Sequence, residues 1–388
     1  MVLSVILATL AALSLSLTLW QLLVAARFPL HRRVVAPDFT PSISVLKPLK
    51  GCDAETRECL RSWFTQDYAG PVELLFGVAS PEDPVCAAVR ELLGEYPARQ
   101  AQLILCDRVL GPNAKVSSLA RLEKLARHEI ICVSDADVWA PPDFLSGAVA
   151  PLRDGQVGLV SCFYRFAGAV NFGMRWEAFA VNADFWSQVL QALSFKPMDF
   201  ALGAAMLMPR ARLALIGGFE PLVDHLADDY QLGNRIARSG ARVMVTPVVV
   251  ECRNAPMGFG EVWAHQLRWA RTIRACRPWP YFWSVLANAA LWPLLWAAII
   301  PGWSSLAGAA LCLAIRWAGG ACLESRMTGR RGIFTGSMAL VKDLLQVTVW
   351  AISFAGRKVS WRGVDYQVKH GGKLVKFSHA EAANPSAT

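Results

Sequence analysis

The apolar residues of this chain are concentrated in long runs near its two ends. Residues Leu3 to Phe28 carry no charge before Arg27, and a helix of this length would cross the ~30 Å hydrocarbon core of a bilayer. No basic residue precedes this run, so we expect a retained anchor over residues 1–28 rather than a cleaved signal peptide. Tyr281 to Ile300 and Trp303 to Leu323 predict two further spans that form a hairpin.

A last apolar stretch, Ile333 to Ala355, is interrupted by Lys342 and Asp343. Basic residues near apolar runs mark the cytoplasmic side of a membrane. Such residues follow the first run and the hairpin, and they are Arg27, Arg32, Arg33, Arg326, Arg330 and Arg331. A full crossing by the last stretch would carry the basic tail, residues 356–388, to the other side. We therefore expect a re-entrant or interfacial element there, within C-terminal membrane segments at 281–355, and a cytoplasmic tail.

Between residues 40 and 258 the pattern changes to alternating strands and helices, which predicts one nucleotide-binding α/β domain. The predicted strands are Ile43–Leu46, Val72–Val78, Leu103–Cys106, Glu129–Val133, Val157–Phe166, Gly203–Pro209 and Arg242–Glu251. The predicted helices are Ala54–Phe64, Val85–Tyr96, Lys115–Arg127, one opened by Pro141-Pro142, Gly173–Leu193, Arg210–Ile216 and Tyr230–Ser239. The sequence contains neither GxGxxG after the first strand nor GxxxxGK[ST], which argues against a dinucleotide enzyme and a P-loop ATPase.

Composition supports a membrane-bound protein. Hydrophobic residues make up 54% and charged residues 18%. The hydrophobic fraction is higher, and the charged fraction lower, than in an ordinary soluble enzyme. The net charge is +9, but the basic residues flank apolar segments, which indicates anionic lipid headgroups and a phosphate-bearing donor rather than nucleic acid. The ten cysteines form no CxxC pair, so we expect reduced, buried thiols.

Two carboxylates, Asp135 and Asp137, follow a predicted buried strand. Open α/β sheets bind ligands at the carboxyl ends of their strands. Mg²⁺ and Mn²⁺ prefer carboxylate oxygens and accept phosphate oxygens as further ligands. Two aspartates at this spacing also occur in solvated turns. The buried strand before Asp135 favours the alternative, a divalent-metal site that would bind a diphosphate leaving group.

Two further segments combine helix starts with charged side chains. Asn113 is placed to cap a helix and Lys115 to face a phosphate, although an ordinary helix start explains both residues better when the segment is taken alone. Asp228 and Asp229 open another helix, where carboxylates commonly only complement the helix dipole. One of them is alternatively suited to accept a proton from an attacking hydroxyl, with its pKa adjusted by the other.

An amphipathic helix is predicted over residues 259–277, directly before the first C-terminal apolar run. It carries His265, Arg268 and Trp269. Arginine binds phosphate bidentately, and tryptophan suits a lipid interface or stacks on a sugar. A purely interfacial membrane anchor explains the same residues, and both interpretations can hold for different faces of one helix.

The acidic pair Asp135 and Asp137, the pair Asp228 and Asp229, and the helix with His265, in this order, resemble the ceramide glucosyltransferase family. This is glycosyltransferase family 21, a group of membrane enzymes with the GT-A fold. The similarity extends from about Ser44 to about Gly372. The bacterial hopanoid-biosynthesis N-acetylglucosaminyltransferases are similar as well, especially at His225 to Tyr230 and at His265 to Arg274. The resemblance implies an α/β GT-A domain with transmembrane helices at both ends.

The resemblance also implies roles for individual residues. Asp135 and Asp137 match the ligands of a divalent metal, Mn²⁺ or Mg²⁺, and of the donor diphosphate. Asp229 matches the catalytic base, with Asp228 beside it in the substrate site.

The donor side and the amphipathic helix are covered by the same resemblance. Asn113 and Lys115 match the donor-side loop of the family. His265, Arg268 and Trp269 match its (Q/R)xxRW element near donor and acceptor.

Two residues depart from the family pattern. His265 stands where glutamine or arginine is usual, although histidine also donates a hydrogen bond. Ser80 stands where the family often has an aspartate that contacts the nucleotide, and Glu82 or Asp83 is a candidate replacement.

Together these features predict an inverting glycosyltransferase that moves one sugar from a UDP-sugar to the hydroxyl of a membrane lipid. We expect a multi-pass protein of the bacterial inner membrane with a cytoplasmic catalytic domain. Ceramide and a hopanoid are both candidate acceptors. A processive polysaccharide synthase would need more spans, and a degenerate nucleotide-sugar-binding protein would not need the intact carboxylates.

Overall fold

The computed structural model describes residues 1–34, 36–330, 335–361 and 363–376. The chain forms two compact units. The sheet unit consists of Pro29–Gly168 and Phe195–Ala255, and the helical unit of Met1–Phe28, Ala169–Ser194 and Pro256–Thr388. Some sequence predictions lie outside the described residues, namely those for Arg331, for the start of the last apolar stretch at Ile333, for Arg362 and for the tail at 377–388.

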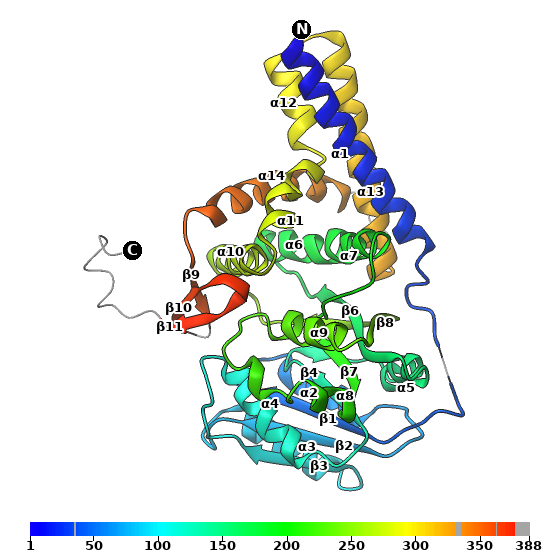
Figure 1. Ribbon diagram of the computed structural model, residues 1–388, viewed down its shortest axis with the longest axis vertical. Coiled ribbons are helices and arrows are strands. Elements are labelled where there is room, and N and C mark those ends of the chain that lie inside the picture. The colour runs from blue at the N-terminus through cyan, green and yellow to red at the C-terminus, as the bar shows by residue number, and fades with distance from the viewer. Residues whose placement is uncertain (35, 331–334, 362, 377–388) are drawn as a thin grey trace, which may run out of the picture. The chain divides into compact units, whose positions relative to one another are not determined.

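The sheet unit is built on an eight-stranded sheet with the order β3-β2-β1-β4-β7-β6-β8-β5 (Figure 1). Its strands are β1 (Ile43–Leu49), β2 (Val72–Val78), β3 (Gln100–Leu105), β4 (Ile130–Ser134), β5 (Val138–Trp139), β6 (Val157–Ala167), β7 (Ala205–Pro209) and β8 (Arg242–Arg253). All seven predicted strands are present, and β5 is additional. The sheet is mixed, since β1 to β4 run parallel to one another while β7 pairs antiparallel with both β4 and β6.

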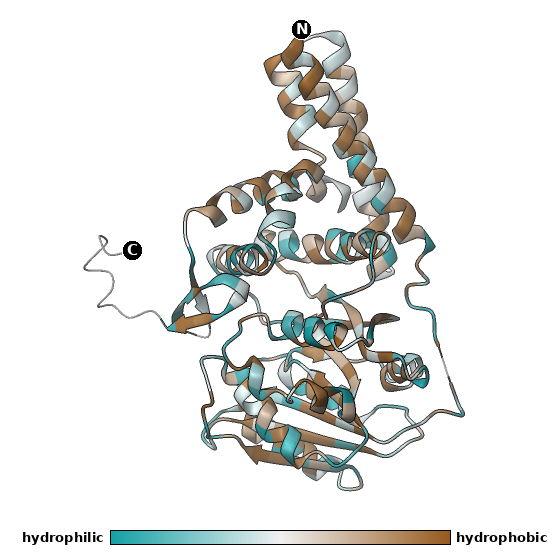
Figure 2. Cartoon of the chain, viewed as in Figure 1, coloured by the Kyte–Doolittle hydropathy of each residue, from teal (hydrophilic) through white to brown (hydrophobic). Residues whose placement is uncertain are grey.

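The parallel half of the sheet forms the hydrophobic core. Every residue of β1 and β4 is buried, as expected for parallel strands covered on both faces. The helices of this unit are α2 (Thr56–Phe64), α3 (Val85–Glu95), α4 (Ala114–Leu125), α5 (Phe144–Val149), α8 (Arg210–Leu215) and α9 (Asp228–Arg238), with short 3₁₀ turns at Ala150–Arg153 and Glu220–Leu222. Figure 2 shows hydrophobic residues along the central strands and hydrophilic residues on α9.

One predicted helix end has a clear backbone cause. Gly217 and Gly218 follow α8 with φ of 85° and 72°, values that glycine adopts without strain. Their N–H groups donate to the carbonyls of Ala214 and Leu213, so they satisfy the end of the helix. These two glycines therefore end the predicted helix Arg210–Ile216.

The helical unit contains the apolar ends of the chain. Its helices are α1 (Val2–Arg27), α6 (Phe172–Phe179), α7 (Trp186–Leu193), α10 (Phe259–Cys276), α11 (Pro278–Trp283), α12 (Leu291–Ile299), α13 (Trp303–Thr328) and α14 (Thr335–Phe354). A π-helical segment, η2 (Ala180–Phe185), joins α6 to α7, so the predicted helix Gly173–Leu193 is continuous but irregular. A 3₁₀ turn, η4 (Ser284–Ala287), follows α11.

Three described helices are long and apolar enough to cross a membrane, and these are α1, α13 and α14. The predicted span Tyr281–Ile300 consists of two helical segments rather than one continuous helix. The segment Pro278–Ala287 meets α12 at an angle of 55°. Asn288 explains the break, because its side-chain oxygen accepts hydrogen bonds from the N–H groups of Ala290 (3.3 Å) and Leu291 (2.9 Å) and so starts a new helix.

The segment expected as a basic tail has structure of its own. Strands β9 (Lys358–Trp361), β10 (Val364–Val368) and β11 (Leu374–Lys376) form a small antiparallel sheet, with a 3₁₀ turn at His370–Gly372. Seven of the ten cysteines are buried, as expected, while Cys52 and Cys322 are exposed and Cys276 is partly buried.

Candidate active site

Hydrogen bonds of its backbone hold the acidic loop at the end of β4 in place. Asp135 N–H donates to the carbonyl of Ala204 (3.1 Å), and the carbonyl of Asp137 accepts from the N–H of Arg253 (2.9 Å). The second contact follows from β5, which pairs with β8 directly after the loop. The Asp135 side chain is 37% exposed. The structure thus places both predicted carboxylates at the carboxyl end of a central strand.

A buried lysine of β1 donates hydrogen bonds to this loop. Lys47 of β1 is fully buried, and its Nζ donates to the carbonyl of Asp135 (2.7 Å) and to Ser134 Oγ (3.1 Å). Burial lowers the pKa of Lys47 to about 8. The ammonium also lies 4.6 Å from the ring centre of Trp63. Lys47 therefore fixes the position of the loop backbone without using the carboxylate of Asp135.

Lys115 connects the acidic loop to the start of α9. Its Nζ lies 2.6 Å from Asp135 Oδ1 and 3.4 Å from Asp228 Oδ2, and its side chain is only 10% exposed. Burial alone would lower the pKa of Lys115, but attraction from the two carboxylates outweighs it and raises that pKa. A permanent positive charge is therefore held between two acidic segments that are far apart in the sequence.

Asn113 performs the capping role predicted for it. Its Oδ1 accepts a hydrogen bond from the N–H of Val116 (3.1 Å) at the start of α4. Its Nδ2 donates to the carbonyl of His225 (2.8 Å) and lies 3.4 Å from Asp228 Oδ1. The same side chain therefore caps one helix and fixes the segment that leads into another.

Asp229, the residue after Asp228, is partly exposed. Burial raises its pKa to about 6, and repulsion from Asp228 acts in the same direction. Room for the carboxylate is made by Gly203, where a Cβ atom would lie 2.8 Å from Asp229 Oδ2. The N–H of Tyr230 donates to Asp229 Oδ1 (2.7 Å). A carboxylate with this pKa is suited to general-base chemistry near neutral pH.

The acidic loop offers two carboxylates, Asp135 and Asp137, to a divalent metal. Burial raises the pKa of Asp137 to about 6, and repulsion from the nearby Asp135 acts in the same direction. This oxygen donor set fits a hard divalent cation, which would relieve the repulsion. Within the described part of the chain, no group of three or more His, Cys, Asp or Glu side chains forms a ready cluster for a metal.

The region of Ser80 follows β2. The Ser80 hydroxyl is hydrogen-bonded to Glu82, which is exposed. The Asp83 carboxylate accepts hydrogen bonds from the N–H groups of Gly51 and Val85, both at 3.0 Å. Of the two candidate replacements for the nucleotide-side aspartate, Asp83 is therefore engaged with backbone and Glu82 is directed to solvent.

His265, Arg268 and Trp269 lie on α10 in the helical unit. The helix has the predicted bounds, and the rings of His265 and Trp269 pack at 4.4 Å between centroids. His265 Nδ1 lies 2.7 Å from Oε1 of Glu177, a residue of α6 whose side chain is 1% exposed. Gln266 Nε2 donates to the same oxygen (3.0 Å). A buried carboxylate thus holds the histidine that departs from the family pattern.

Three residues at these positions were not recognised as functional from the sequence, namely Lys47, Glu177 and Gly203. Lys47 is a lone charge within a buried strand, and Glu177 is a lone acidic residue on a mostly buried helix. Because charged residues are rarely buried without a partner, both could have been singled out from the sequence. Gly203 carries none, because its close approach to Asp229 exists only in the folded chain.

The sheet unit has the GT-A glycosyltransferase fold. Its mixed sheet carries an acidic loop after β4, and Lys115 connects this loop to the acidic start of α9. The mannosyltransferase PcManGT from Pyrobaculum calidifontis, solved in complex with GDP-Man and Mn²⁺, has a similar structure. The similarity covers 91% of this chain and 97% of that one, with a TM-score of 0.55 and 24% identity. The model of glycosyl transferase family 21 matches residues 5–374, and the chain belongs to this family.

Curated relatives carry the same family name. Ceramide glucosyltransferase 1 of Caenorhabditis elegans is 24% identical over 220 residues, which are 56% of this chain and 47% of that protein. The ceramide glucosyltransferase of Candida albicans is 33% identical over 122 residues, 29% of this chain and 22% of that protein. The aligned region is thus about half or less of the length of these relatives. The family and the fold predicted from the sequence are confirmed.

Proposed function

We propose that this protein transfers one sugar from a UDP-sugar to the hydroxyl of a membrane lipid, in keeping with relatives that are named ceramide glucosyltransferases. The observation that carries the proposal is Asp229, a partly exposed carboxylate with a raised pKa, beside the ion pairs of Lys115 with Asp135 and Asp228. The family supports a glycosyltransferase, and helices long enough to cross a membrane support a lipid acceptor.

In the proposed reaction, the acceptor hydroxyl oxygen attacks the anomeric carbon of the sugar. Asp229 takes the hydroxyl proton as the new carbon–oxygen bond forms. The bond between the anomeric carbon and the diphosphate oxygen breaks, and its electron pair leaves with UDP. Attack from the face opposite the diphosphate inverts the configuration at that carbon.

Lys115 and its partners are assigned to the donor diphosphate. Its ammonium is fixed between Asp135 and Asp228, and Asn113 holds the segment before Asp228 in place. A fixed cation stabilises charge that develops on a leaving diphosphate, because no side chain has to reorganise during the reaction. The proposed substrate site therefore includes Asn113, Lys115 and Asp228.

Asp135 and Asp137 are assigned to a divalent metal, Mn²⁺ or Mg²⁺. When bound, such an ion supplies charge neutralisation to the diphosphate and leaves proton transfer to the protein. The two carboxylates fit it by chemistry and by their mutual repulsion. Mn²⁺ in the similar mannosyltransferase structure supports this choice of ion.

The rest of the chain is assigned to membrane binding and to substrate contact. We propose a transmembrane anchor at residues 1–28, a cytoplasmic GT-A domain at 40–258, an interfacial helix at 259–277, membrane segments at 281–355 and a cytoplasmic tail from 356. His265, Arg268 and Trp269 of the interfacial helix are proposed to contact donor or acceptor, since the family motif matches there. An inner-membrane location in bacteria completes this proposal.

The test is sugar transfer by membranes that contain the full chain, supplied with a labelled UDP-sugar, Mn²⁺ and either ceramide or a hopanoid. Asp229→Asn keeps the shape of the side chain and should lower the rate by about 10²–10⁴-fold, the usual contribution of a general base. Asp224→Asn is the matched control, since Asp224 is exposed shortly before α9. Near-normal turnover by Asp229→Asn would refute the base. Transfer only to the hopanoid would change the acceptor, and binding of UDP-sugar without transfer would indicate a degenerate protein.

A further inference from the structure

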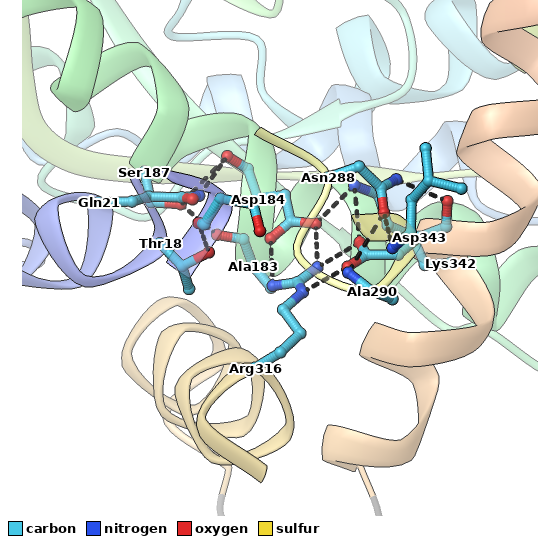
Figure 3. Close-up of polar contacts among 12 residues, drawn as sticks. Thr18, Gln21, Ala183, Asp184, Ser187, Asn288, Ala290, Arg316, Lys342 and Asp343 are labelled. Atoms are coloured by element: carbon cyan, nitrogen blue, oxygen red, sulfur yellow. Dashed lines mark hydrogen bonds and ion pairs between the residues drawn. The ribbon is translucent and has the colours of Figure 1, made fainter. Parts of the chain in front are cut away.

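Four charged side chains form a buried cluster in the helical unit, the ionic cluster Asp184, Arg316, Lys342 and Asp343 (Figure 3). Arg316 binds both oxygens of Asp184 at 2.7 and 3.0 Å and both oxygens of Asp343 at 2.8 and 2.9 Å. Lys342 Nζ lies 2.7 Å from Asp184 Oδ2. No side chain of the cluster is more than 9% exposed, and its formal charges sum to zero. The cluster is therefore a complete ionic network inside the protein.

The ionic cluster joins elements that are distant in the sequence. Asp184 belongs to the π-helical segment between α6 and α7, Arg316 to the middle of α13, and Lys342 and Asp343 to the middle of α14. The side chain of Asn288, at the bend before α12, donates to the carbonyl of Asp343 (2.8 Å). These contacts place the middle of α14 at the same level as the π-helical segment.

The level of the π-helical segment follows from the path of the chain. The segment Ala169–Ser194 leaves the sheet after β6 and returns to it at β7, and these two strands are antiparallel neighbours. A segment with both ends in one sheet does not cross a bilayer once. Asp184 therefore lies in a helical segment that begins and ends on the side of the membrane where the sheet lies.

Two helices that are expected to cross the bilayer give the depth of the ionic cluster. From Trp303 to Arg316, α13 rises ~20 Å at 1.5 Å per residue. In α1, the carbonyl of Leu17 accepts from Gln191 of α7 (2.9 Å), and Val2 to Leu17 rises by a similar ~22 Å. A hydrocarbon core of ~30 Å leaves ~10 Å on the near side, so the cluster lies within the near leaflet.

The packing of α14 agrees with this level. Val349 of α14 is fully buried in one hydrophobic cluster with Trp176 of α6 and Val262 of α10. The indole N–H of Trp350 donates to the carbonyl of Tyr281 (3.1 Å). Figure 1 shows α14 running across the direction of α1, α12 and α13 rather than along it. The helix thus belongs to the layer of α6 and α10.

We infer that α14 does not cross the membrane but lies in the plane of the near leaflet, with its outer face in contact with lipid. Length and composition alone would permit a crossing. A crossing would carry Lys342 and Asp343 to the middle of the bilayer and away from Asp184. The in-plane position keeps them in the neutral network, where no charge is exposed to hydrocarbon.

The surface beside α14 has the composition of a membrane interface. Large apolar side chains are exposed on α14 and on the neighbouring α11, and they are Trp279, Phe282, Trp283, Leu344, Ile352 and Phe354. Tryptophan is enriched where lipid headgroups meet acyl chains. Exposed cations follow on the small sheet, at Arg357, Lys369, Lys373 and Lys376. The partner that fits this combination is a bilayer surface rich in anionic lipid.

The two arrangements predict different positions for the ends of α14. Ser337→Cys and Ala355→Cys place single thiols at exposed positions near these ends. The parent for labelling carries Cys52→Ser and Cys322→Ser, because these two thiols are exposed. A membrane-impermeant maleimide is applied to inverted and right-side-out membrane vesicles, and labelling of native Cys52 alone defines the side of the sheet unit.

If α14 lies in the plane, both new thiols are labelled from the side that labels Cys52. Labelling of Ser337→Cys and Ala355→Cys from opposite sides would overturn the inference. A reporter protein fused after Thr388 of the otherwise unchanged chain gives a second reading that needs no cysteine variant, and its activity on the side opposite Cys52 would also overturn it. The inference rests on the membrane location in the proposed function but not on sugar transfer, so loss of activity leaves this test intact.

Discussion

At the scale of single residues, the account depends on Asp229 as a base whose pKa is set by its surroundings. Burial and repulsion from Asp228 raise this pKa to about 6. The carboxylate takes up a proton as the pH falls through about 6, and a protonated carboxyl does not accept the hydroxyl proton. The transfer rate should therefore fall about tenfold per pH unit below 6 and level off above it.

A variant of the neighbouring carboxylate tests the cause of this pH dependence. Asp228→Asn removes the like charge beside Asp229, so the acidic limb of the pH–rate profile should move to lower pH, whatever the change in the maximal rate. Asp224→Asn, at an exposed position, should leave the limb unchanged. A limb that stays near pH 6 in Asp228→Asn would separate the pH dependence from the Asp228–Asp229 pair.

Glu177 is expected to act through His265. The carboxylate lies 2.7 Å from His265 Nδ1, so it favours the ring with a proton on Nδ1 and fixes its orientation. Glu177→Gln removes the negative charge that faces His265 and should lower the transfer rate by about tenfold, which corresponds to ~1.4 kcal/mol.

The role of Glu177 is measured by a double-mutant cycle in kcat and KM. In a His265→Gln background, the additional change Glu177→Gln should have little effect, because the partner is already absent. Equal losses in both backgrounds would show that Glu177 only supports the packing of α6 and α10.

At the scale of elements, the position of the acidic helix start depends on how closely α9 approaches a loop. A Cβ atom at Gly233 would lie 2.2 Å from the N atom of Ala201 and 2.3 Å from the carbonyl carbon of Phe200. Gly233→Ala should displace α9, with Asp228 and Asp229, and destabilise the fold by about 1–3 kcal/mol, as overpacking does.

Gly94→Ala is the matched control for this change. Gly94 is also helical, and no atom lies within 4 Å of a Cβ there, so alanine should stabilise the protein by about 0.5–1 kcal/mol. Thermal unfolding in detergent and the transfer rate measure both variants. Unchanged stability and rate in Gly233→Ala would contradict the tight packing of α9.

Most elements were predictable because their signals are local. The amphipathic pattern of α10 gave its bounds, Phe259–Cys276, and Asn113 caps α4 as its position indicated. Strand β5 has only two residues and exists through pairing with β8, more than a hundred residues later, so no local pattern marks it. The bend at Asn288 was missed because the apolar run continues through a polar residue that starts a new helix.

At the scale of the whole molecule, the division into two units could not be read from the sequence. The helix predicted over Gly173–Leu193 is present, but its segment, Ala169–Ser194, belongs to the helical unit although sheet strands precede and follow it. Its partners, such as Val262 and Val349, lie far along the chain. The family was predictable from the order of its motifs, and the acceptor hydroxyl was not, because contacts to a lipid leave no short pattern.

The central claim is that this protein glycosylates a membrane lipid with Asp229 as the base. The most direct measurement is mass spectrometry of total lipids from cells that lack the protein, carry the wild-type chain or carry Asp229→Asn at equal membrane levels. The account predicts a lipid with one added hexose or N-acetylhexosamine in the wild-type cells only. The same glycolipid at equal abundance with Asp229→Asn, or no new glycolipid with the wild-type chain, would contradict it.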